Sequence, residues 1–157
     1  CDPTKKGSHT GAQTPAAAKA NGAGGVLINH SESPMSKADI TQLIKELKSL
    51  RMKSILCVKD LKQAKEYSKL KPSMVAIEPP ELIGGKKSVC KAKPQLIIDA
   101  AKAVGRIPLL VGAGVHSKHD VVMALKLGAK GILVASDILK SKSPTKELKD
   151  LLAGFEE

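Results

Sequence analysis

The sequence predicts an α/β fold in which parallel strands alternate with helices. Short apolar runs, such as residues 25–29 and 74–78, alternate with longer stretches whose apolar residues recur at helical spacing, such as residues 37–50. The alternation repeats about five times, which is typical of βαβ units that build a parallel sheet with helices outside it. A second observation agrees: His30 and Glu78, two side chains suited to chemistry, stand at the ends of apolar runs. In parallel α/β folds, ligands bind at the carboxyl ends of the strands.

Five apolar runs are predicted to be strands, because each is short, continuous and bounded by turn residues. They are residues 25–29, 54–58, 74–78, 107–111 and 131–134. A strand with one wet face would alternate apolar and polar residues along its length. Continuous runs are instead typical of parallel strands that are covered on both faces.

The helices follow from apolar spacing and from their end signals. Within residues 37–50, apolar side chains including Leu43 and Leu47 recur on one face, as in an amphipathic helix. Pro94 suits the first turn of a helix, and residues 117–120 have the form of a capping box. The other predicted helices are residues 16–21, 61–70, 94–104, 118–127 and 144–154.

The length of 157 residues predicts a single domain, residues 1–157. A hydrophobic share of 42% is sufficient for a core, but the chain has one Tyr, one Phe and no Trp, so that core must be aliphatic. A closed (β/α)₈ barrel usually needs about 250 residues and at least about 200. From the strand pattern alone, the chain is therefore either an open sheet or most of a barrel whose first strands are absent.

The formal net charge of +11 favours an acidic partner, which could be nucleic acid, an anionic membrane or a phosphorylated small molecule. The lysines are scattered along helical segments without a dense run, so most of this charge is interpreted as a solvated surface. The near absence of aromatic residues removes the stacking platform on which single-stranded nucleic acids bind. No apolar run is long enough to predict a signal peptide or a membrane span. We therefore expect no nucleic-acid partner and no membrane.

The cysteines predict a reducing, cytoplasmic compartment. There are three, Cys1, Cys57 and Cys90, and their wide spacing argues against both a disulfide framework and a structural zinc site. Cys57 lies in a predicted strand and is interpreted as a packing residue.

Residues 75–85 contain the candidate on which the functional interpretation depends. The apolar run ends in Glu78, two prolines stiffen the exit, and Gly84 and Gly85 allow the following loop to bend. This arrangement predicts a general base at a strand end beneath a hinged, anion-binding loop. The alternative is a surface glutamate that caps a turn.

Four motifs resemble the triosephosphate isomerase family, in its compact archaeal form. They are Asn29-His30-Ser31-Glu32, Glu78-Pro79-Pro80-Glu81-Leu82-Ile83-Gly84, Gly112-Ala113-Gly114-Val115 and Val134-Ala135-Ser136. Each follows a predicted strand, and their order matches the family. The resemblance implies a (β/α)₈ TIM barrel that here lacks about the first three strands, so that the chain is the C-terminal part of the barrel, strands 4 to 8.

The resemblance also implies an activity. Members of this family interconvert dihydroxyacetone phosphate and D-glyceraldehyde 3-phosphate through an enediol(ate), in glycolysis and gluconeogenesis, without a cofactor or a metal. Glu78 would be the proton acceptor, His30 the neutral electrophile and Glu32 a supporting residue. Backbone amides would hold the substrate phosphate at Ile83, Gly84, Gly114, Ala135 and Ser136. Thr10 lies in a segment that resembles the interdigitating loop of the family, which implies a homodimer or a homotetramer.

Three departures from the family pattern affect this interpretation. The asparagine and lysine of the family's first strand have no counterpart in the sequence, so Glu32 would lack its usual partner. Ser33 and Pro34 replace basic residues, and Asp137 stands where many members have glycine, next to the implied phosphate site. The first departure keeps open a non-catalytic or split half-barrel that needs a partner chain.

A second alternative is another barrel enzyme that binds a phosphorylated sugar. The remaining histidines, His9, His116 and His119, are assigned no chemistry. Residues 90–94 are interpreted as a loop that leads into a helix.

Overall fold

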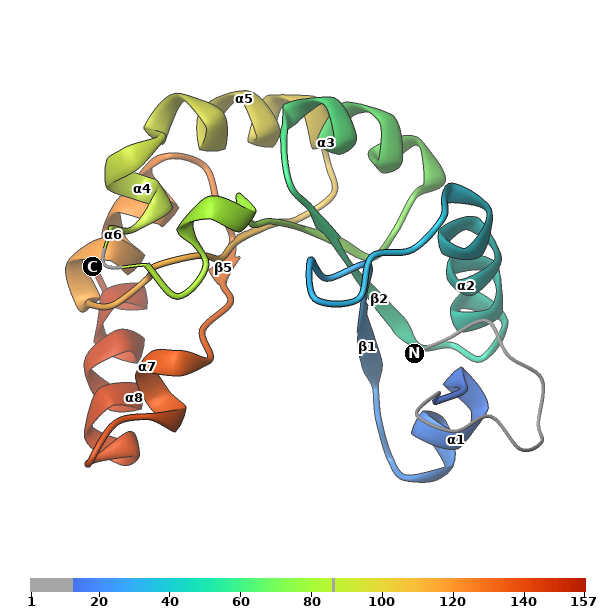
Figure 1. The fold of residues 1–157 in the computed structure, drawn as a ribbon, viewed down its shortest axis with the longest axis horizontal. Helices are drawn as coiled ribbons and strands as arrows, with labels where there is room; N and C mark the ends of the chain where they lie inside the picture. Colours follow the sequence, from blue (N-terminus) through green and yellow to red (C-terminus); the bar gives the residue numbers. More distant parts are fainter. Residues whose placement is uncertain (1–12, 86) are drawn as a thin grey trace.

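The computed structural model describes residues 13–85 and 87–157, and the five predicted strands are present in it (Figure 1). They form one sheet of five parallel strands in the order β1-β2-β3-β4-β5. Their bounds are β1 (Gly25–Ile28), β2 (Lys53–Val58), β3 (Met74–Ile77), β4 (Leu109–Val111) and β5 (Gly131–Ile132). Each strand is added beside the preceding one, as in a barrel wall. The doubly wound open sheet would instead reverse its strand order at a switch point.

The helices curve around the outside of the strands, so that the described residues form an open arc (Figure 1). They are α1 (Pro15–Ala20), α2 (Lys37–Ser49), α3 (Leu61–Tyr67), α4 (Val89–Ala92), α5 (Pro94–Val104), α6 (Lys118–Lys126), α7 (Ser136–Leu139) and α8 (Pro144–Leu152), with 3₁₀ turns η1 (Ser68–Leu70), η2 (Pro80–Leu82) and η3 (Ala153–Phe155). The short elements η2, α4 and α7 were not predicted, and α4 corrects the expectation of a loop at its position. Within the part of the chain that the structure describes, no helix has both the length and the apolar character needed to cross a bilayer.

Side-chain caps start several of the helices. The hydroxyl of Ser36 accepts from the N–H of Asp39 at 3.1 Å at the start of α2. At the start of α6, the Ser117 hydroxyl accepts from the N–H of Asp120 at 3.3 Å, which confirms the predicted cap there. Such caps satisfy backbone donors that the first helical turn leaves without partners, each typically worth ~1 kcal/mol.

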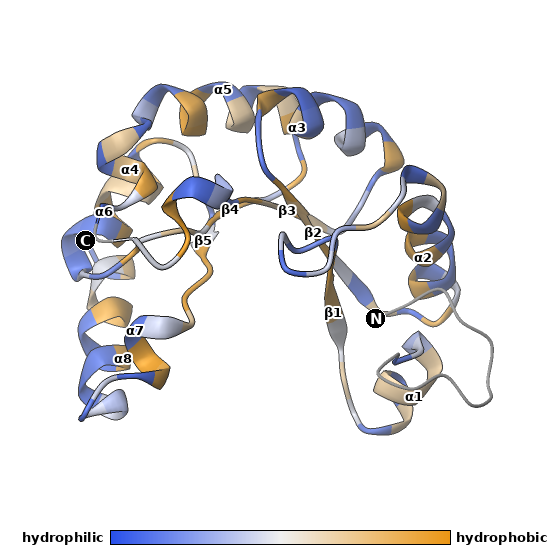
Figure 2. Cartoon of the chain, viewed as in Figure 1, coloured by the Kyte–Doolittle hydropathy of each residue, from blue (hydrophilic) through white to orange (hydrophobic). Residues whose placement is uncertain are grey.

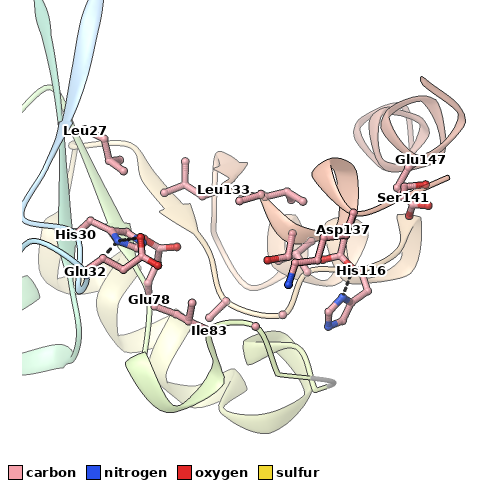
Figure 3. A pocket seen from close by; sticks show the side chains of 18 residues that line it. Leu27, His30, Glu32, Glu78, Ile83, His116, Leu133, Asp137, Ser141 and Glu147 are labelled. Carbon is pink, nitrogen blue, oxygen red and sulfur yellow. Dashed lines mark hydrogen bonds and ion pairs between the residues drawn. The ribbon is translucent and has the colours of Figure 1, made fainter. Parts of the chain in front are cut away.

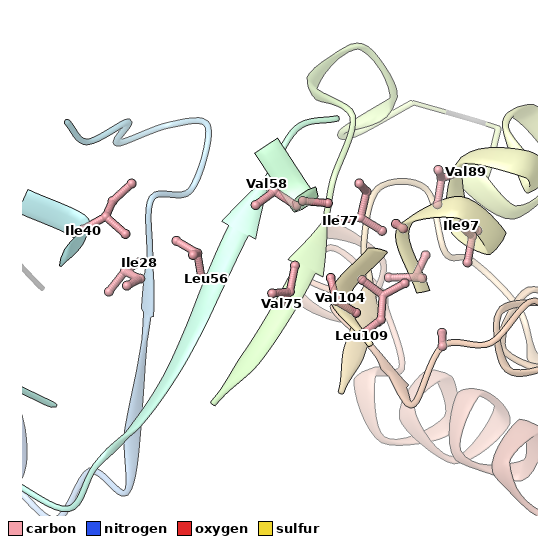
Figure 4. Close-up of a cluster of buried hydrophobic side chains, with 14 of the residues drawn as sticks. Ile28, Ile40, Leu56, Val58, Val75, Ile77, Val89, Ile97, Val104 and Leu109 are labelled. Carbon is pink, nitrogen blue, oxygen red and sulfur yellow. The ribbon is translucent and has the colours of Figure 1, made fainter. Parts of the chain in front are cut away.

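The main core lies between the strands and the surrounding helices (Figure 4). Ile28, Leu56, Val75 and Leu109 are aligned across four adjacent strands by their pairing register, and all four are buried. The helices direct their apolar faces toward these side chains and their charged faces outward (Figure 2). From α2 the core receives Ile40, Leu43, Ile44 and Leu47. Fully burying an aliphatic side chain of this size contributes roughly 1.5–3 kcal/mol before the entropy cost is counted.

The other face of the sheet carries the residues that alternate with this core set. Cys57 and Ala76 are register partners on that face and are buried, whereas Leu27 is 40% exposed. Glu78 directly follows β3 and, by the same alternation, lies on the face of Ala76. Its N–H donates to the carbonyl of Val58 at 2.9 Å, which continues the ladder between β2 and β3 and fixes the backbone of Glu78.

Candidate active site

A cavity of about 630 Å³ opens beyond the C-terminal ends of the strands, and the predicted site residues of the described part gather around it (Figure 3). Eight of them line it: His30, Glu32, Glu78, Ile83, Gly84, Gly114, Ala135 and Ser136. They come from the segments after β1, β3, β4 and β5. This is the end at which a parallel α/β sheet binds its ligands.

His30 and Glu78 face each other at one side of the cavity (Figure 3). The His30 Nε2 and Glu78 Oε2 atoms are 3.6 Å apart, and the side chains are 26% and 10% exposed. The separation is longer than a good hydrogen bond, which leaves each group able to contact a third molecule. Both groups are sufficiently sheltered from water for their electrostatic effects to be strong.

One hydrogen bond indicates which nitrogen of His30 is free to donate. The N–H of Glu32 donates to His30 Nδ1 at 3.3 Å, so Nδ1 is an acceptor without a proton. The carboxylate of Glu32 lies 3.7 Å from the same nitrogen but is 86% exposed, so the backbone contact decides the assignment. With Nδ1 as an acceptor, the neutral ring carries its proton on Nε2, the nitrogen that faces Glu78.

Asn29 holds the turn from which His30 projects. It has a left-handed backbone with φ of 58°, a conformation that asparagine tolerates better than most residues. Its side-chain amide donates to the carbonyl of Cys57 at 2.9 Å and accepts from the N–H of Met35 at 3.0 Å. These contacts join the end of β1 to the end of β2 and orient the segment that carries the imidazole.

Cys57 contacts the carboxylate of Glu78 from the neighbouring strand. Its thiol lies 3.3 Å from Glu78 Oε2 in donor geometry. Burial, reinforced by the nearby negative charge of Glu78, raises the pKa of the thiol far above its usual range, so that it stays protonated and donates. The sequence pattern predicted only a packing role for Cys57 and did not reveal its contact with Glu78. The adjacency of β2 and β3 brings the two together across 21 residues, which no local motif reveals.

Gly112 makes room for Glu78 at the end of β4. A Cβ atom built on this glycine would lie 2.2 Å from Glu78 Oε1 and 2.7 Å from its Cδ and Cγ atoms. The backbone φ of Gly112 is not in the left-handed region, so close approach and not conformation requires the glycine. The carboxylate of Glu78 is thus confined between Cys57, His30 and Gly112.

The turn after β4 brings backbone close to the cavity. Ala113 and Gly114 both have left-handed backbones, with φ of 74° and 70°. A Cβ on Gly114 would lie 2.4 Å from the carbonyl oxygen of Lys87. The position therefore requires glycine for two reasons, the left-handed backbone and the lack of space for a side chain. Alanine in this region is strained by roughly 1–3 kcal/mol, and such strain persists where the surroundings hold it in place, often at binding sites. The Ala113 carbonyl accepts from the N–H of Val89 at 3.1 Å.

The predicted phosphate-binding amides differ in their availability. The N–H of Ile83 already donates to the carbonyl of Pro80 at 3.2 Å within η2. Within residues 13–85 and 87–157, the N–H groups of Gly84, Gly114 and Ser136 have no acceptor. Three unpaired donors beside one cavity provide an environment that suits an anion.

His116 and Asp137 form a pair at the other side of the cavity (Figure 3). His116 Nδ1 lies 2.7 Å from Asp137 Oδ1, and its Nε2 lies 2.9 Å from the carbonyl oxygen of Gly85. The bond to Asp137 raises the pKa of His116 above its ordinary value, against a smaller opposing effect of burial. The sequence assigned His116 no chemistry, which misses this pair. Asp137 stands next to the implied phosphate site and does not cap α7, which has no side-chain cap; its carboxylate pairs with His116 instead.

Two of the sequence candidates, Thr10 and His9, lie outside the described residues, and His119 is exposed on α6. The carboxylate of Glu32 extends into solvent, as its 86% exposure shows. In residues 13–85 and 87–157, no group of three or more His, Cys, Asp or Glu side chains is placed to hold a metal ion.

Comparison with known proteins shows the family. The family model for triosephosphate isomerase matches residues 1–152. The chain is 46% identical over 154 residues to triosephosphate isomerase of Saccharolobus solfataricus, with 96% of this chain and 68% of that protein covered. It is 45% identical over 148 residues to triosephosphate isomerase of Cenarchaeum symbiosum, with 92% of this chain and 67% of that protein covered. The chain therefore spans about two thirds of the length of these relatives.

Solved structures agree at the level of the fold. Thiamine phosphate pyrophosphorylase from Pyrococcus furiosus superposes with a TM-score of 0.66 at 19% identity, covering 90% of this chain and 63% of that one. A mutant tryptophan synthase α-subunit from the same organism gives a TM-score of 0.68 at 21% identity, covering 88% and 58%. With these folds, the family match and the consecutive parallel strands, the five-stranded arc is part of a TIM barrel. The chain belongs to the triosephosphate isomerase family.

Proposed function

We propose that the full-length gene product interconverts dihydroxyacetone phosphate and D-glyceraldehyde 3-phosphate, with Glu78 as the base and His30 as the electrophile. The observation that carries the proposal is the placement of His30 Nε2, the nitrogen left free to donate, 3.6 Å from the sheltered carboxylate of Glu78 at one cavity. Isomerisation of a 2-ketose to an aldose needs these two groups: a base for a carbon-bound proton and a donor for the carbonyl oxygen.

The chemistry follows from where the two groups point. Glu78 takes the proton from the carbon beside the carbonyl, and the electron pair of that C–H bond forms the C=C bond of an enediolate. His30 Nε2–H donates to the carbonyl oxygen on which negative charge develops. Glu78 then returns the proton to the former carbonyl carbon, and the hydroxyl proton of the first carbon passes to the former carbonyl oxygen. A new carbonyl forms on the first carbon, and the isomerisation ends without a net change in protons. Because one carboxylate serves both carbons, it must stay in place, and Cys57 and Gly112 confine it.

The phosphate group of the substrate occupies the far side of the cavity from His30. The unpaired N–H groups of Gly84, Gly114 and Ser136 support this placement, since backbone donors suit phosphate oxygens. The proposal extends to Ala135, whose backbone borders the same space, and to Ile83 once the η2 turn releases its N–H. Glu32 has a supporting role through the backbone donor that sets the tautomer of His30.

Further parts of the proposal rest on the family. We infer a phosphorylated triose as substrate, assembly as a homodimer or homotetramer through the segment around Thr10, and a cytoplasmic location in glycolysis and gluconeogenesis. The family match and the positive net charge of +11 support an anionic substrate.

The test is a coupled spectrophotometric assay of the full-length gene product, with a panel of phosphorylated sugars as substrates. We expect turnover of both trioses in either direction and none with pentose or hexose phosphates. Glu78→Gln should lower kcat by about 10²–10⁴-fold, the usual contribution of a positioned base. Turnover of another phosphosugar alone would assign a different barrel enzyme. A stable, folded protein without any isomerase activity would favour the non-catalytic alternative.

A further inference from the structure

The pair of His116 and Asp137 joins three segments around the phosphate side of the cavity. His116 follows β4, Asp137 is in α7, and Gly85 lies in the loop after β3. The side chains of His116 and Asp137 are only partly exposed, at 33% and 29%. No other described side chain bridges the loop after β3 to α7 in this way.

Both ring nitrogens of His116 face oxygen acceptors. A carboxylate oxygen and a backbone carbonyl oxygen cannot donate, so both bonds form only if both nitrogens carry protons. The ring is then an imidazolium, and its charge offsets that of Asp137. In the neutral form, one nitrogen would present a lone pair either to Asp137 or to Gly85, and that contact would become repulsive.

Other charges around His116 do not replace this role. The buried carboxylate of Asp120 accepts the backbone N–H of His116 at 3.2 Å and raises the pKa of the ring slightly, but Lys91 already pairs with it at 3.0 Å. On α6, Lys118 pairs with Glu157 at 2.6 Å, and His119 is exposed. Lys140 and Glu147 line the same cavity and oppose each other in sign.

We infer that His116 is a positioning residue for the phosphate side of the site: as an imidazolium it neutralises Asp137 and holds the loop after β3 through Gly85. Two consequences follow for an anion in the cavity. First, the carboxylate of Asp137 no longer repels the anion. Second, the bond to Gly85 keeps the neighbouring Gly84 in place, so that its unpaired N–H lines the same cavity as those of Gly114 and Ser136. This inference rests on the proposed function for its ligand, a phosphate ester, but the bond network itself does not depend on that assignment.

The first test separates charge neutralisation from simple support. The full-length gene product and its His116→Gln, Asp137→Asn and double variants are compared by KM, kcat and the calorimetric affinity for inorganic phosphate. His116→Gln leaves the Asp137 carboxylate without its counter-charge, so we expect phosphate affinity to fall and KM to rise by roughly three- to tenfold, with kcat within about twofold. Asp137→Asn should change affinity little, and the double variant should recover most of the loss. His119→Gln, an exposed histidine on the same segment, is the matched control and should behave as the unmodified protein.

A double variant as weak as His116→Gln alone would overturn the inference, because it would show that only packing is lost. Phosphate affinity unchanged in His116→Gln would overturn it as well. Thermal unfolding of all five proteins shows whether each folds, and only folded variants are compared.

The second test uses pH and needs no turnover. Sulfate remains a dianion between pH 5 and 9, so any change in its affinity over this range reports on titration of the protein and not of the ligand. The range is about that over which a histidine titrates. We expect sulfate affinity to fall as pH rises through the pKa of His116, measured on the same sample by NMR, and the dependence to flatten in His116→Gln. An equal pH dependence in both proteins would contradict the inference. If the protein shows this pH dependence of sulfate affinity but has no isomerase activity, the proposed reaction is contradicted and the inferred role of His116 is not.

Discussion

The His30 Nε2 and Glu78 Oε2 atoms lie 3.6 Å apart although their residues follow β1 and β3, two strands that do not pair with each other. The strand between them, β2, completes the arrangement. Its Cys57 thiol reaches Glu78, its Val58 carbonyl accepts the N–H of Glu78, and its Cys57 carbonyl accepts from Asn29. The candidate active site is therefore built by three adjacent strand ends, and changes that displace any of them should affect the same chemistry.

Replacing Gly112 with alanine tests the confinement of Glu78. The added Cβ would lie 2.2 Å from Glu78 Oε1, so the carboxylate must move. A base displaced by about 1 Å loses on the order of 10²-fold in rate, so we expect kcat to fall by about that factor in the coupled assay. Gly24→Ala is the matched control, because nothing lies within 4 Å of a Cβ there and its backbone is not left-handed. Equal kcat values for the two variants would show that Glu78 is not confined by Gly112.

The tautomer of His30 can be observed directly. Because Nδ1 accepts the N–H of Glu32, we expect ¹⁵N NMR to show a proton on Nε2 and none on Nδ1. The His30→Gln variant assigns the signal and should lower kcat by about 10²–10³-fold, since the electrophilic donor is lost. A ring protonated on Nδ1, or an imidazolium, would contradict the proposed electrophile.

The two described cysteines should resist alkylation in the native protein. Burial raises the pKa of the Cys57 thiol, and burial raises that of Cys90 to about 11, so little thiolate exists at pH 8. Iodoacetamide at pH 8 followed by peptide mass mapping should leave both unmodified in the folded protein and modify both in urea. Rapid native modification of Cys57 would show that its thiol is not the sheltered donor to Glu78.

The buried carboxylate of Asp120 makes stability depend on acid. Burial alone would raise the pKa of Asp120, but its bonds with Lys91, Ser88, Ser117 and the His116 N–H hold it below the ordinary value. A lowered pKa contributes stability above the unfolded pKa of about 3.9, and this contribution is lost as pH falls through the folded value. At pH 7, Asp120→Asn should lower the free energy of unfolding by about 1–3 kcal/mol.

Urea unfolding at pH 7 and at pH 3 measures this effect. The difference between Asp120→Asn and the unmodified protein should shrink at the lower pH. Asp150→Asn, on the exposed surface of α8, is the control and should show no such convergence. A constant difference at both pH values would mean that the charge of Asp120 is not what stabilises the fold.

Much of the fold could be predicted from local signals. The helix α5 begins at Pro94 and ends at Val104 as expected, because proline favours a first turn and Gly105 ends the helix with a left-handed backbone. The strands β4 and β5 are shorter than their apolar runs suggest. Pairing and not hydrophobicity sets a strand's length, and β5 pairs with β4 over only two residues.

The short elements and one part of the site could not be predicted. The helix α4 has four residues, too few for a periodic pattern, and tertiary bonds such as Val89 N–H to the Ala113 carbonyl hold it. His116 and Asp137 are 21 residues apart, the first in the loop after β4 and the second in α7, and only the positions of β4 and β5 bring them together. His30 and Glu78 could be found because each stands directly at a strand end within a recognisable motif.

Proton exchange with solvent tests the central proposal most directly. The full-length gene product is incubated with dihydroxyacetone phosphate in D₂O, and ¹H NMR follows the label in recovered substrate and product. A base that carries the proton through an enediolate exchanges it with solvent, so we expect one deuterium on the carbon that receives the proton, and Glu78→Gln should abolish its appearance. If the Glu78→Gln variant forms deuterium-labelled product at an undiminished rate, the assignment of Glu78 as the base is contradicted.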